Sequence, residues 1–491
     1  MGIFIRVGTT RATVWTETKE QLKHLYDACS YWVPGAERSE LYETGIWDGY
    51  KRLLRMTGDT RGTFPSGLAH RVYNEAQALA PGDVAIHYEA EPDLMPIDVH
   101  LADGAKPRNY QEEAVRKALE HKRCVLQVAT GGGKTFIAAL LISKVRERTL
   151  FVVHTKDLLY QAKGAFEEFL TGVKIGQIGD GVVDPGEVTV ATIQTLARAV
   201  GVQAQKNPFD DADTSERPIE MKALTKAAIK GVLAKSRLVI WDEVHRIASD
   251  TAYGLSQKIP EARYRVGLSA SPWRDDGHDM LIEAAMGPTV YKVSATYLAE
   301  RGYLVPPIIR TVRVPCAIPW HKDPRDYKRI YKEEIVENEY RNEMVVKMAR
   351  DFMERGITTL ILVSQIRHGR KLAKMITEQY HPVEFVSGND SSEKRKQAIQ
   401  EMREGKRVCL VASTIADEGL DIRRLGALIL AGGGKSSTRA LQRIGRVLRP
   451  FEGKKVAYVV DFADEAKYLR VHAEKRKEIY RTEPGFTILE L

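Results

Sequence analysis

Two short stretches of this 491-residue sequence combine residue types that bind and hydrolyse nucleoside triphosphates. The first, QVATGGGKTF (127–136), runs from an apolar segment into three glycines and then Lys134 and Thr135. Glycines let backbone N–H groups close around phosphates, while Lys134 can reach the β- and γ-phosphates and the Thr135 hydroxyl can bind Mg²⁺. Val128 stands where the full pattern has its first glycine, so an ordinary glycine-rich turn is the alternative. The predicted loop residues are Thr130, Gly131, Gly132, Gly133, Lys134 and Thr135.

The second stretch, RLVIWDEVHR (237–246), places two adjacent carboxylates at the end of an apolar strand. Open α/β sheets bind their ligands at the carboxyl ends of their strands. Asp242 can therefore hold Mg²⁺, and Glu243 can orient and deprotonate an attacking water. An isolated Asp-Glu pair is usually a solvated strand end, but the preceding phosphate loop favours the catalytic interpretation.

A third stretch, ALQRIGRVLRPF (440–451), repeats arginine every three residues, at Arg443, Arg446 and Arg449. On a helix these side chains share one broad face, and the nearby positions are mostly apolar or glycine rather than acidic. This pattern indicates contact with a polyanion, and stabilisation of a γ-phosphate in the transition state is the specific form of that contact.

The elements that must position these residues are apolar runs alternating with amphipathic segments. Such spacing predicts parallel sheets covered by helices, and the pattern is long enough for two sheets, the first ending near residue 290 and the second beginning near 345. A Pro- and acid-rich stretch near residues 89–107 predicts a linker after an N-terminal domain. The predicted strands are 123–130, 149–155, 188–192, 237–243, 264–271, 359–365, 407–413, 427–432 and 456–462.

Composition and charge narrow the class of protein further. Apolar residues make up 43% and charged residues 28%, as in soluble globular proteins. We expect no membrane span and no signal segment, and the four scattered cysteines predict a reduced, cytoplasmic protein without a zinc or iron–sulfur site. Residues 1–103 carry 10 Lys and Arg against 15 Asp and Glu, whereas the remainder carries 64 against 50. The larger part is thus basic, which is compatible with a nucleic-acid partner.

Seven motifs in order resemble those of superfamily-two helicases and translocases, over residues 108–450: ATGGGKT, HTKDLLYQ, ATIQTL, DEVH, SAS, ASTIADEGLDI and QRIGRVLR. The resemblance implies two RecA-like domains in tandem, use of ATP and Mg²⁺, and catalysis that requires both domains. It also implies that Gln111 senses adenine and that His245 and residues 269–271 couple nucleotide state to nucleic acid. Gly419 and Asp421 would approach the nucleotide from the second domain, and Gln442, Arg446 and Arg449 would complete the site.

The N-terminal stretch 42–72, with its Trp-Asp-Gly element, resembles the UvsW-like phage helicases, which are related to the XPB and RecG types. GLSASPWRDDG, ENEYRN (337–342) and the tail RKEIYRTEPGF fit the same group. The implied activity is remodelling of branched DNA in replication, recombination and repair: fork regression, junction migration and R-loop unwinding. The implied architecture is an α/β protein: a small α+β DNA-binding domain (1–103), a RecA-like domain (104–300), a linker or helical insert (301–344), and a second RecA-like domain with a C-terminal tail (345–491).

The expected nucleic-acid contacts address the phosphate backbone, so we expect little sequence specificity. A core packing role for Trp47 and a solvated face for Lys51 and Arg52 are the alternatives. For the group Tyr327, Arg329 and Tyr331, packing of a linker helix is favoured over stacking on DNA. The predicted contacts are Thr155, Thr192, Ser364, Gln365, Thr414, Trp47, Lys51 and Arg52.

Three other functions share parts of this pattern. An RNA helicase or a restriction-type motor subunit would have the same core, and an ATP-switched annealing or binding scaffold would bind ATP without using hydrolysis. The appended N-terminal domain, the missing nuclease signature and the intact Glu243, Arg446 and Arg449 argue against them. We expect a monomer in the cytoplasm, which for a phage-encoded protein is the host cytoplasm or nucleoid. We expect it to act on branched, duplex or single-stranded DNA or RNA–DNA hybrids, with single-strand-binding or recombination proteins as partners.

Overall fold

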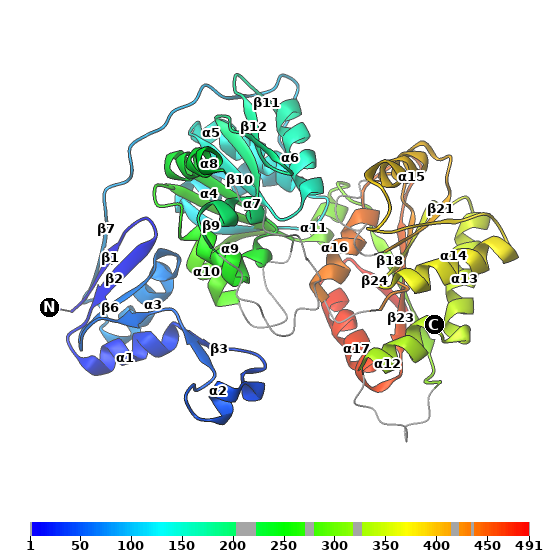
Figure 1. The fold of residues 1–491 in the computed structure, drawn as a ribbon, viewed down its shortest axis with the longest axis horizontal. Coiled ribbons are helices and arrows are strands. Elements are labelled where there is room, and N and C mark those ends of the chain that lie inside the picture. Colours follow the sequence, from blue (N-terminus) through cyan, green and yellow to red (C-terminus); the bar gives the residue numbers. More distant parts are fainter. Residues whose placement is uncertain are drawn as a thin grey trace. The chain divides into compact units, whose positions relative to one another are not determined.

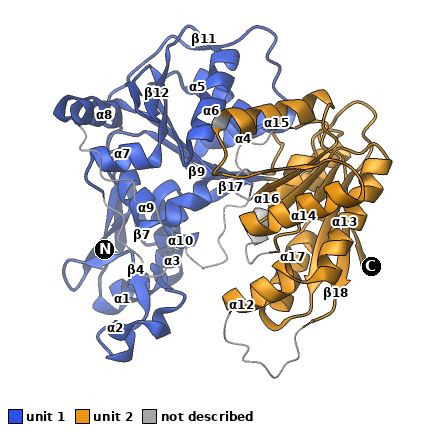
Figure 2. Cartoon of the chain, turned by 45° about the vertical axis from the view of Figure 1, so that its right-hand side comes forward, with its two compact units in different colours: residues 1–128, 133–292 blue, residues 129–132, 293–491 orange. Residues whose placement is uncertain are grey.

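The computed structural model describes residues 2–202, 222–270, 279–317, 327–413, 422–433 and 437–490, apart from the side chains of residues 392, 437–440 and 442. The chain divides into two compact units, residues 1–128 with 133–292, and residues 129–132 with 293–491 (Figure 2). Each unit is built around parallel strands covered by helices, as the sequence predicts. In the described residues no helix is both long and apolar enough to cross a membrane.

The first unit begins with an N-terminal module, residues 3–88, around a five-stranded sheet of order β5-β6-β2-β1-β7 (Figure 1). A two-stranded hairpin, β3 and β4, and a short helix extend from it. Its strands are β1 Ile3–Val7, β2 Arg11–Trp15, β3 Ser30–Trp32, β4 Tyr50–Arg52, β5 Arg55–Met56, β6 Arg61–Pro65 and β7 Val84–Tyr88; its helices are α1 Lys19–Ala28, α2 Glu40–Glu43 and α3 Ala69–Leu79, with 3-10 turns η1 Ala36–Arg38 and η2 Ser66–Leu68.

The first core sheet has eight strands in the order β13-β12-β14-β10-β15-β16-β9-β17. From β12 through β14, β10, β15 and β16 to β9 the neighbouring strands are parallel, and the edge strand β13 is antiparallel to β12. The strands are β9 Arg123–Val128, β10 Thr149–Val153, β12 Ile175–Gly179, β13 Val182–Asp184, β14 Val188–Thr192, β15 Leu238–Asp242, β16 Tyr264–Ser269 and β17 Thr289–Val293, and a small pair joins β8 His100–Leu101 to β11 Leu170–Thr171. The helices are α4 Asn109–His121, α5 Lys134–Val145, α6 Lys156–Phe169, α7 Ile193–Ala199, α8 Ala223–Lys235, α9 Asp250–Ser256 and α10 Asp279–Met286, with the 3-10 turn η3 Val244–Ala248.

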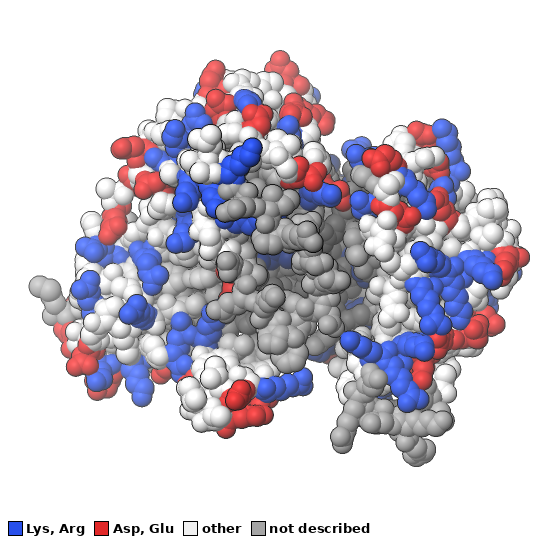
Figure 3. Space-filling model, in the orientation of Figure 1, with Lys and Arg blue, Asp and Glu red and all other residues white. Residues whose placement is uncertain are grey.

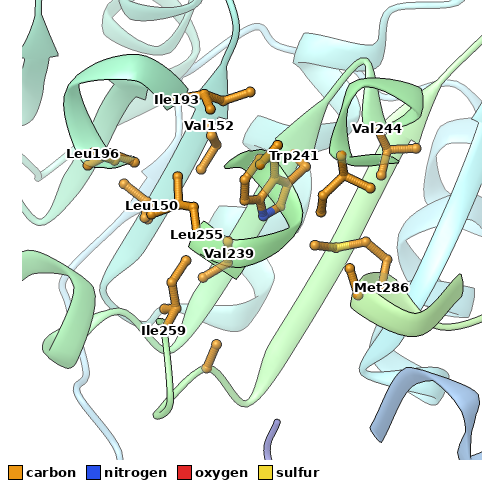
Figure 4. Packing of buried hydrophobic residues seen from close by; sticks show 14 of the residues in the cluster. Leu150, Val152, Ile193, Leu196, Val239, Trp241, Val244, Leu255, Ile259 and Met286 are labelled. Atoms are coloured by element: carbon orange, nitrogen blue, oxygen red, sulfur yellow. The ribbon is translucent and has the colours of Figure 1, made fainter. Parts of the chain in front are cut away.

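The core of this sheet is apolar around β15, the strand that ends in the two carboxylates. Val239 and Trp241 on β15 pack beside Leu150 and Val152 of β10, and helix α9 adds Leu255 (Figure 4). These side chains are all buried. Because a close-packed interior resists displacement, the carboxyl end of β15 has a well-defined position.

The N-terminal module is packed against the first core sheet by close contacts. A Cβ added to Gly67 would lie 2.2 Å from the carbonyl oxygen of Glu283 on α10. The Arg71 guanidinium binds the Glu283 carboxylate, with Nη2 and Oε2 2.6 Å apart, and Arg123 at the start of β9 donates to the carbonyl of Thr9. Module and sheet therefore form one compact unit.

The second unit holds a seven-stranded sheet of order β20-β21-β19-β22-β23-β18-β24, with parallel pairing throughout. Its strands are β18 Pro307–Val314, β19 Thr359–Val363, β20 Glu384–Val386, β21 Cys409–Ser413, β22 Ala427–Ile429, β23 Ala457–Asp464 and β24 Thr487–Glu490. Its helices are α11 Ala295–Glu300, α12 Tyr327–Tyr331, α13 Glu339–Glu354, α14 Ile366–Gln379, α15 Ser392–Glu404, α16 Ser437–Val447 and α17 Lys467–Arg481, with a π-helical turn η4 Lys332–Val336.

Strand β18 lies inside the segment 301–344 that the sequence predicts to be a linker or helical insert. It pairs with β23 over its whole length, from Pro307 opposite Ala457 to Val314 opposite Asp464, and with β24 on its other side. Its sequence PIIRTVRV alternates apolar residues with arginine and threonine rather than forming the continuous apolar run expected of a buried parallel strand. Because β18 lacks a continuous apolar run, the sequence pattern did not predict it as a strand.

Candidate functional site

The predicted phosphate loop lies between β9 and the N-terminus of α5, where helix geometry leaves backbone N–H groups without helical partners. Gly131 and Gly133 have φ of 85° and 76°, a left-handed conformation that favours glycine. A Cβ added to Gly133 would also lie 2.8 Å from Nε2 of Gln111. Glycine is therefore required at Gly133 both for its φ angle and for the close approach of Gln111.

Gln111, the predicted adenine sensor, lies on α4 and is buried. Its Oε1 accepts a hydrogen bond from the backbone N–H of Arg108 at 2.9 Å, which caps the first turn of α4. This contact fixes the amide beside the phosphate loop. The structure thus brings Gln111 beside Gly133 of the loop, and its role as an adenine sensor stays a prediction.

Lys134 and Glu243 meet directly at the carboxyl edge of the first core sheet. Lys134 Nζ lies 3.2 Å from Glu243 Oε1, and the two side chains are 13% and 17% exposed. Asp242 ends β15, and its Oδ1 accepts the backbone N–H of Glu243 at 3.1 Å. Lys134 at the end of the loop and the two carboxylates, which are far apart in the sequence, therefore form one cluster in space.

The second oxygen of Glu243 contacts a separate pair of side chains. Ser269 at the end of β16 donates to Glu243 Oε2 at 3.2 Å, and Nδ1 of His245 lies 3.3 Å from the Ser269 hydroxyl and 3.4 Å from the same Oε2. Glu243 itself has φ of 49°, a conformation that glutamate rarely adopts. This backbone geometry lets neighbouring residues 242 and 243 serve different partners.

The titratable side chains of the site have pKa values shifted in different directions. Burial, together with the charge of Glu243, raises the pKa of Asp242 to about 6. Burial also opposes ionisation of Glu243, but the opposing effect of its charged neighbours, Lys134 first among them, outweighs burial and holds the pKa of Glu243 below its ordinary value. Burial lowers the pKa of His245 to about 4, so that this imidazole is neutral at physiological pH.

The donors at this edge fit a hard divalent cation. Asp242 supplies carboxylate oxygens, Thr135 supplies a hydroxyl at the start of α5, and Mg²⁺ prefers oxygen ligands with room for water and phosphate oxygens. Because a nearby cation favours the ionised carboxylate, binding would also reverse the raised pKa of Asp242. The residues present are thus compatible with the Mg²⁺ that the resemblance implies.

The predicted phosphate contacts of the first unit end neighbouring strands. Thr155 follows β10 and caps α6, its hydroxyl accepting from the N–H of Leu158 at 3.3 Å. Thr192 ends β14, is 6% exposed and donates to the hydroxyl of Thr195 at 2.9 Å. Both threonines lie on the same sheet edge as Asp242, but each hydroxyl already has a structural partner.

Trp47, Lys51 and Arg52 lie on and beside the β3–β4 hairpin of the N-terminal module. The Trp47 indole donates to the carbonyl of Tyr50 at 2.8 Å, and Arg52 forms an ion pair with Asp48. Lys51 Nζ lies 2.8 Å from Oδ1 of Asp250 on α9. These contacts hold the hairpin in shape and tie it to α9, but Trp47 is partly exposed rather than a core residue, and its contact with nucleic acid stays a prediction.

In the second unit Ser364 and Gln365 follow β19 and are exposed. Thr414, Gly419 and Asp421 lie outside the described residues, as does the side chain of Gln442. On the face shown in Figure 3, Lys and Arg side chains gather where α14 and α17 lie. Sequence analysis did not single out the four cations of α14, Arg367, Arg370, Lys371 and Lys374.

The arginine segment forms helix α16 and the turn after it. Arg443 is buried, and Arg446 and Arg449 are partly exposed. Sequence analysis missed Lys454, whose partly buried side chain donates to the carbonyls of Leu425 at 2.6 Å and Arg449 at 2.9 Å and also to that of Val447. A single lysine in a loop gives no pattern to detect, yet this one holds the C-terminal end of α16.

Two sequence families match the chain. Residues 104–274 match the family described as type III restriction enzyme, res subunit, and residues 341–450 match the helicase conserved C-terminal domain. The ATP-dependent DNA helicase uvsW of Enterobacteria phage T4 is 25% identical over 481 residues, covering 92% of this chain and 89% of that protein. The DNA 3'-5' translocase XPB2 of Sulfurisphaera tokodaii is 26% identical over 385 residues, covering 71% of this chain and 80% of that protein.

A viral protein of the Sulfolobus islandicus filamentous virus that also carries a helicase name is 26% identical over 379 residues, a match that spans 72% of this chain and 63% of that protein. Among solved structures, Saccharomyces cerevisiae Dbp5 bound to RNA and ADP BeF3 matches with a TM-score of 0.54, 14% identity and coverage of 79% of this chain and 90% of that one. At this identity the structural likeness concerns the fold alone, two RecA-like domains in tandem.

Proposed function

Since the chain belongs to the superfamily-two helicases and is an ATP-hydrolysing DNA helicase or translocase, we propose that its substrates are branched DNA molecules: regressing forks, migrating junctions and R-loops. The observation that carries this proposal is the extent of the match to the phage T4 helicase, which covers 92% of the chain and so reaches into the N-terminal module, whereas the match to the archaeal translocase covers 71% of the chain. The module is the part that a general core motor does not need.

In the proposed mechanism, water attacks the γ-phosphorus in line with the leaving ADP. Glu243 orients that water and accepts its proton, because its lowered pKa keeps it ionised near neutral pH. Lys134 leaves its contact with Glu243 Oε1 and donates to the β- and γ-phosphate oxygens. Bound Mg²⁺, held by Asp242 and Thr135, would neutralise phosphate charge. We assign Arg446 and Arg449 to stabilisation of the γ-phosphate.

Hydrolysis is coupled to nucleic acid through the second oxygen of Glu243. Ser269 and His245 touch this oxygen, and Ser269 stands at the start of the segment that resembles a coupling motif. Backbone phosphates would be contacted through the threonines and serines at the strand ends, among them Thr155, Thr192 and Ser364. We further propose that the protein acts as a monomer and that single-strand-binding or recombination proteins are its partners.

The test compares ATP hydrolysis at fixed salt with single-stranded, duplex, four-way-junction and R-loop nucleic acids. We expect the strongest stimulation with branched DNA. Glu243→Gln should bind ATP but hydrolyse it about 10²- to 10⁴-fold more slowly and lose junction unwinding, because a general base is removed. Glu168→Gln, an exposed glutamate of the same unit, is the matched control and should behave as wild type.

Other outcomes would redirect the proposal. Stimulation mainly by RNA would make the protein an RNA helicase. Fork remodelling by Glu243→Gln at the wild-type rate would favour the ATP-switched scaffold. A restriction-type motor, which the family description of residues 104–274 keeps open, would hydrolyse ATP with plain duplex as well as with junctions.

A further inference from the structure

The ENEYRN stretch anchors the start of α13 inside the second unit. Asn338 caps the helix, its side chain accepting from the N–H of Arg341 at 3.1 Å. Arg341 is fully buried: its Nε lies 2.7 Å from Oδ1 of Asp464, its Nη1 donates to the carbonyl of Ala431 at 2.6 Å, and its guanidinium lies over the ring of Phe462. One arginine therefore joins α13 to the segment that follows β22 and to the end of β23.

The next residue joins α13 to α14. Asn342 donates to the carbonyl of Val336 at 3.0 Å, and its Oδ1 lies 2.9 Å from Nε2 of His368, which is buried on α14. Helix α14 begins directly after Ser364 and Gln365, the candidate nucleic-acid contacts. The anchored helices thus frame the loop that carries these two residues.

Tyr331, on the helix before α13, contacts Gly432, which packs beside this loop. Its side chain is 6% exposed, and its hydroxyl donates to the carbonyl of Gly432 at 2.6 Å. The hydroxyl of Ser364 donates to the same carbonyl at 3.3 Å, although Ser364 itself is exposed. Gly432 packs closely here, since an added Cβ would lie 2.6 Å from the Ser364 nitrogen. One carbonyl oxygen therefore accepts from a buried tyrosine and from a surface serine.

A serine hydroxyl has one proton, so Ser364 cannot donate to Gly432 and to a phosphate oxygen at once. If it turned to a phosphate with no other donor present, the Gly432 carbonyl would lose its side-chain partner, and an unpaired buried acceptor is costly. Tyr331 removes this cost because its hydroxyl stays on the carbonyl.

We propose that Tyr331 is a positioning residue for nucleic-acid binding: by keeping the Gly432 carbonyl hydrogen-bonded, it frees the Ser364 hydroxyl to donate to a backbone phosphate. The inference rests on the proposed function, in which Ser364 contacts such a phosphate. It gives the buried hydroxyl of Tyr331 a role that packing of the ring alone does not require.

The test measures ATP hydrolysis against DNA concentration, with fluorescence anisotropy as a direct measure of DNA binding. In Tyr331→Phe the ring is kept and only the hydroxyl is lost, so we expect the half-saturating DNA concentration to rise about five- to tenfold. The kcat at saturating DNA and the KM for ATP should stay at wild-type values. Tyr327→Phe, on the same helix and 38% exposed, is the matched control and should match wild type.

A double variant separates positioning from general structural damage. If Tyr331 acts through Ser364, Tyr331→Phe should add nothing to the weaker DNA binding of Ser364→Ala. A Tyr331→Phe variant with unchanged half-saturation, an effect that persists in the Ser364→Ala background, or a loss of kcat in place of the affinity change would overturn the inference. A wild type that no DNA stimulates or binds would instead contradict the proposed function, and this inference with it.

Discussion

Glu243 divides its two carboxylate oxygens between two tasks. One faces Lys134, which belongs to the phosphate loop, and the other faces Ser269 and His245. A positive φ makes this arrangement possible at a cost of order 1–3 kcal/mol, which the surrounding packing must supply. The strain is thus found at the residue that we propose orients the attacking water.

A different histidine offers a test at the residue scale. Burial, assisted by Arg341 and Lys371, lowers the pKa of His368 to about 3. Between this value and the ordinary histidine pKa near 6.5, the unfolded chain binds a proton that the native chain excludes. Stability from the neutral imidazole is complete above about pH 6.5 and is lost as the pH falls.

We therefore expect the free energy of unfolding of wild type to fall between pH 6.5 and 4, with His368 contributing at most about 1.4 kcal/mol per pH unit. Urea unfolding at several pH values measures this slope. The free energy of unfolding of His368→Gln should fall less steeply over the same pH range. Equal slopes for the two proteins would contradict the assignment of this pH dependence to His368.

The sequence predicted the residues whose types and order carry chemistry. Lys134, Asp242 and Glu243 lie in short motifs that end apolar strands, so their neighbourhood in space follows from parallel sheet topology. Lys454 was not found this way, and for Tyr331 the sequence favoured packing without showing the carbonyl that its hydroxyl contacts 101 residues away. Such contacts depend on packing, which a single sequence does not display.

At the scale of elements, the N-terminal module approaches the backbone of α10 most closely at one glycine. Gly67 approaches the carbonyls of Glu283 and Ala284 so closely that any side chain would collide with backbone. Gly67→Val should separate the module from the core sheet and expose the segment 89–107, which limited proteolysis would detect.

Gly58→Ala is the control for this prediction, since a Cβ there would meet nothing within 4 Å. It should leave the proteolysis pattern unchanged. If Gly67→Val were as resistant as wild type, the close approach would not be what holds the module in place.

Long apolar runs predicted the nine strands β9, β10, β14, β15, β16, β19, β21, β22 and β23, whose starts lie within two residues of the prediction. Strands without such runs were missed. β12 contains two glycines and a glutamine, β20 has three residues, and β18 alternates in character. Their strand state comes from neighbours that complete a sheet, which local patterns do not encode. The domain limits proposed from the sequence remain a prediction.

At the scale of the molecule, the charge distribution predicts a salt-dependent affinity for DNA. Residues 104–491 carry 64 Lys and Arg against 50 Asp and Glu, and cation–phosphate contacts release counterions. The logarithm of the binding constant should fall linearly with the logarithm of the KCl concentration, by about 0.9 for each such contact.

Ser364→Ala sharpens this measurement, because a neutral hydroxyl displaces no counterion. The binding constant of the variant should be lower than that of wild type at every KCl concentration, and the slope of its logarithm against the logarithm of the KCl concentration should be the same. A binding constant that is insensitive to KCl would contradict backbone recognition, and a changed slope in the variant would contradict a neutral contact at Ser364.

The contacts of the N-terminal module keep it at a constant position relative to the first core sheet. Gly67, Arg71 and Arg123 tie the module to the sheet that carries Lys134, Asp242 and Glu243. A motor needs one part that stays still while another moves, and the module shares its compact unit with these residues. Because the module and the first core sheet belong to one compact unit, a DNA arm bound by the module, as the sequence predicts, would keep a constant distance from Lys134.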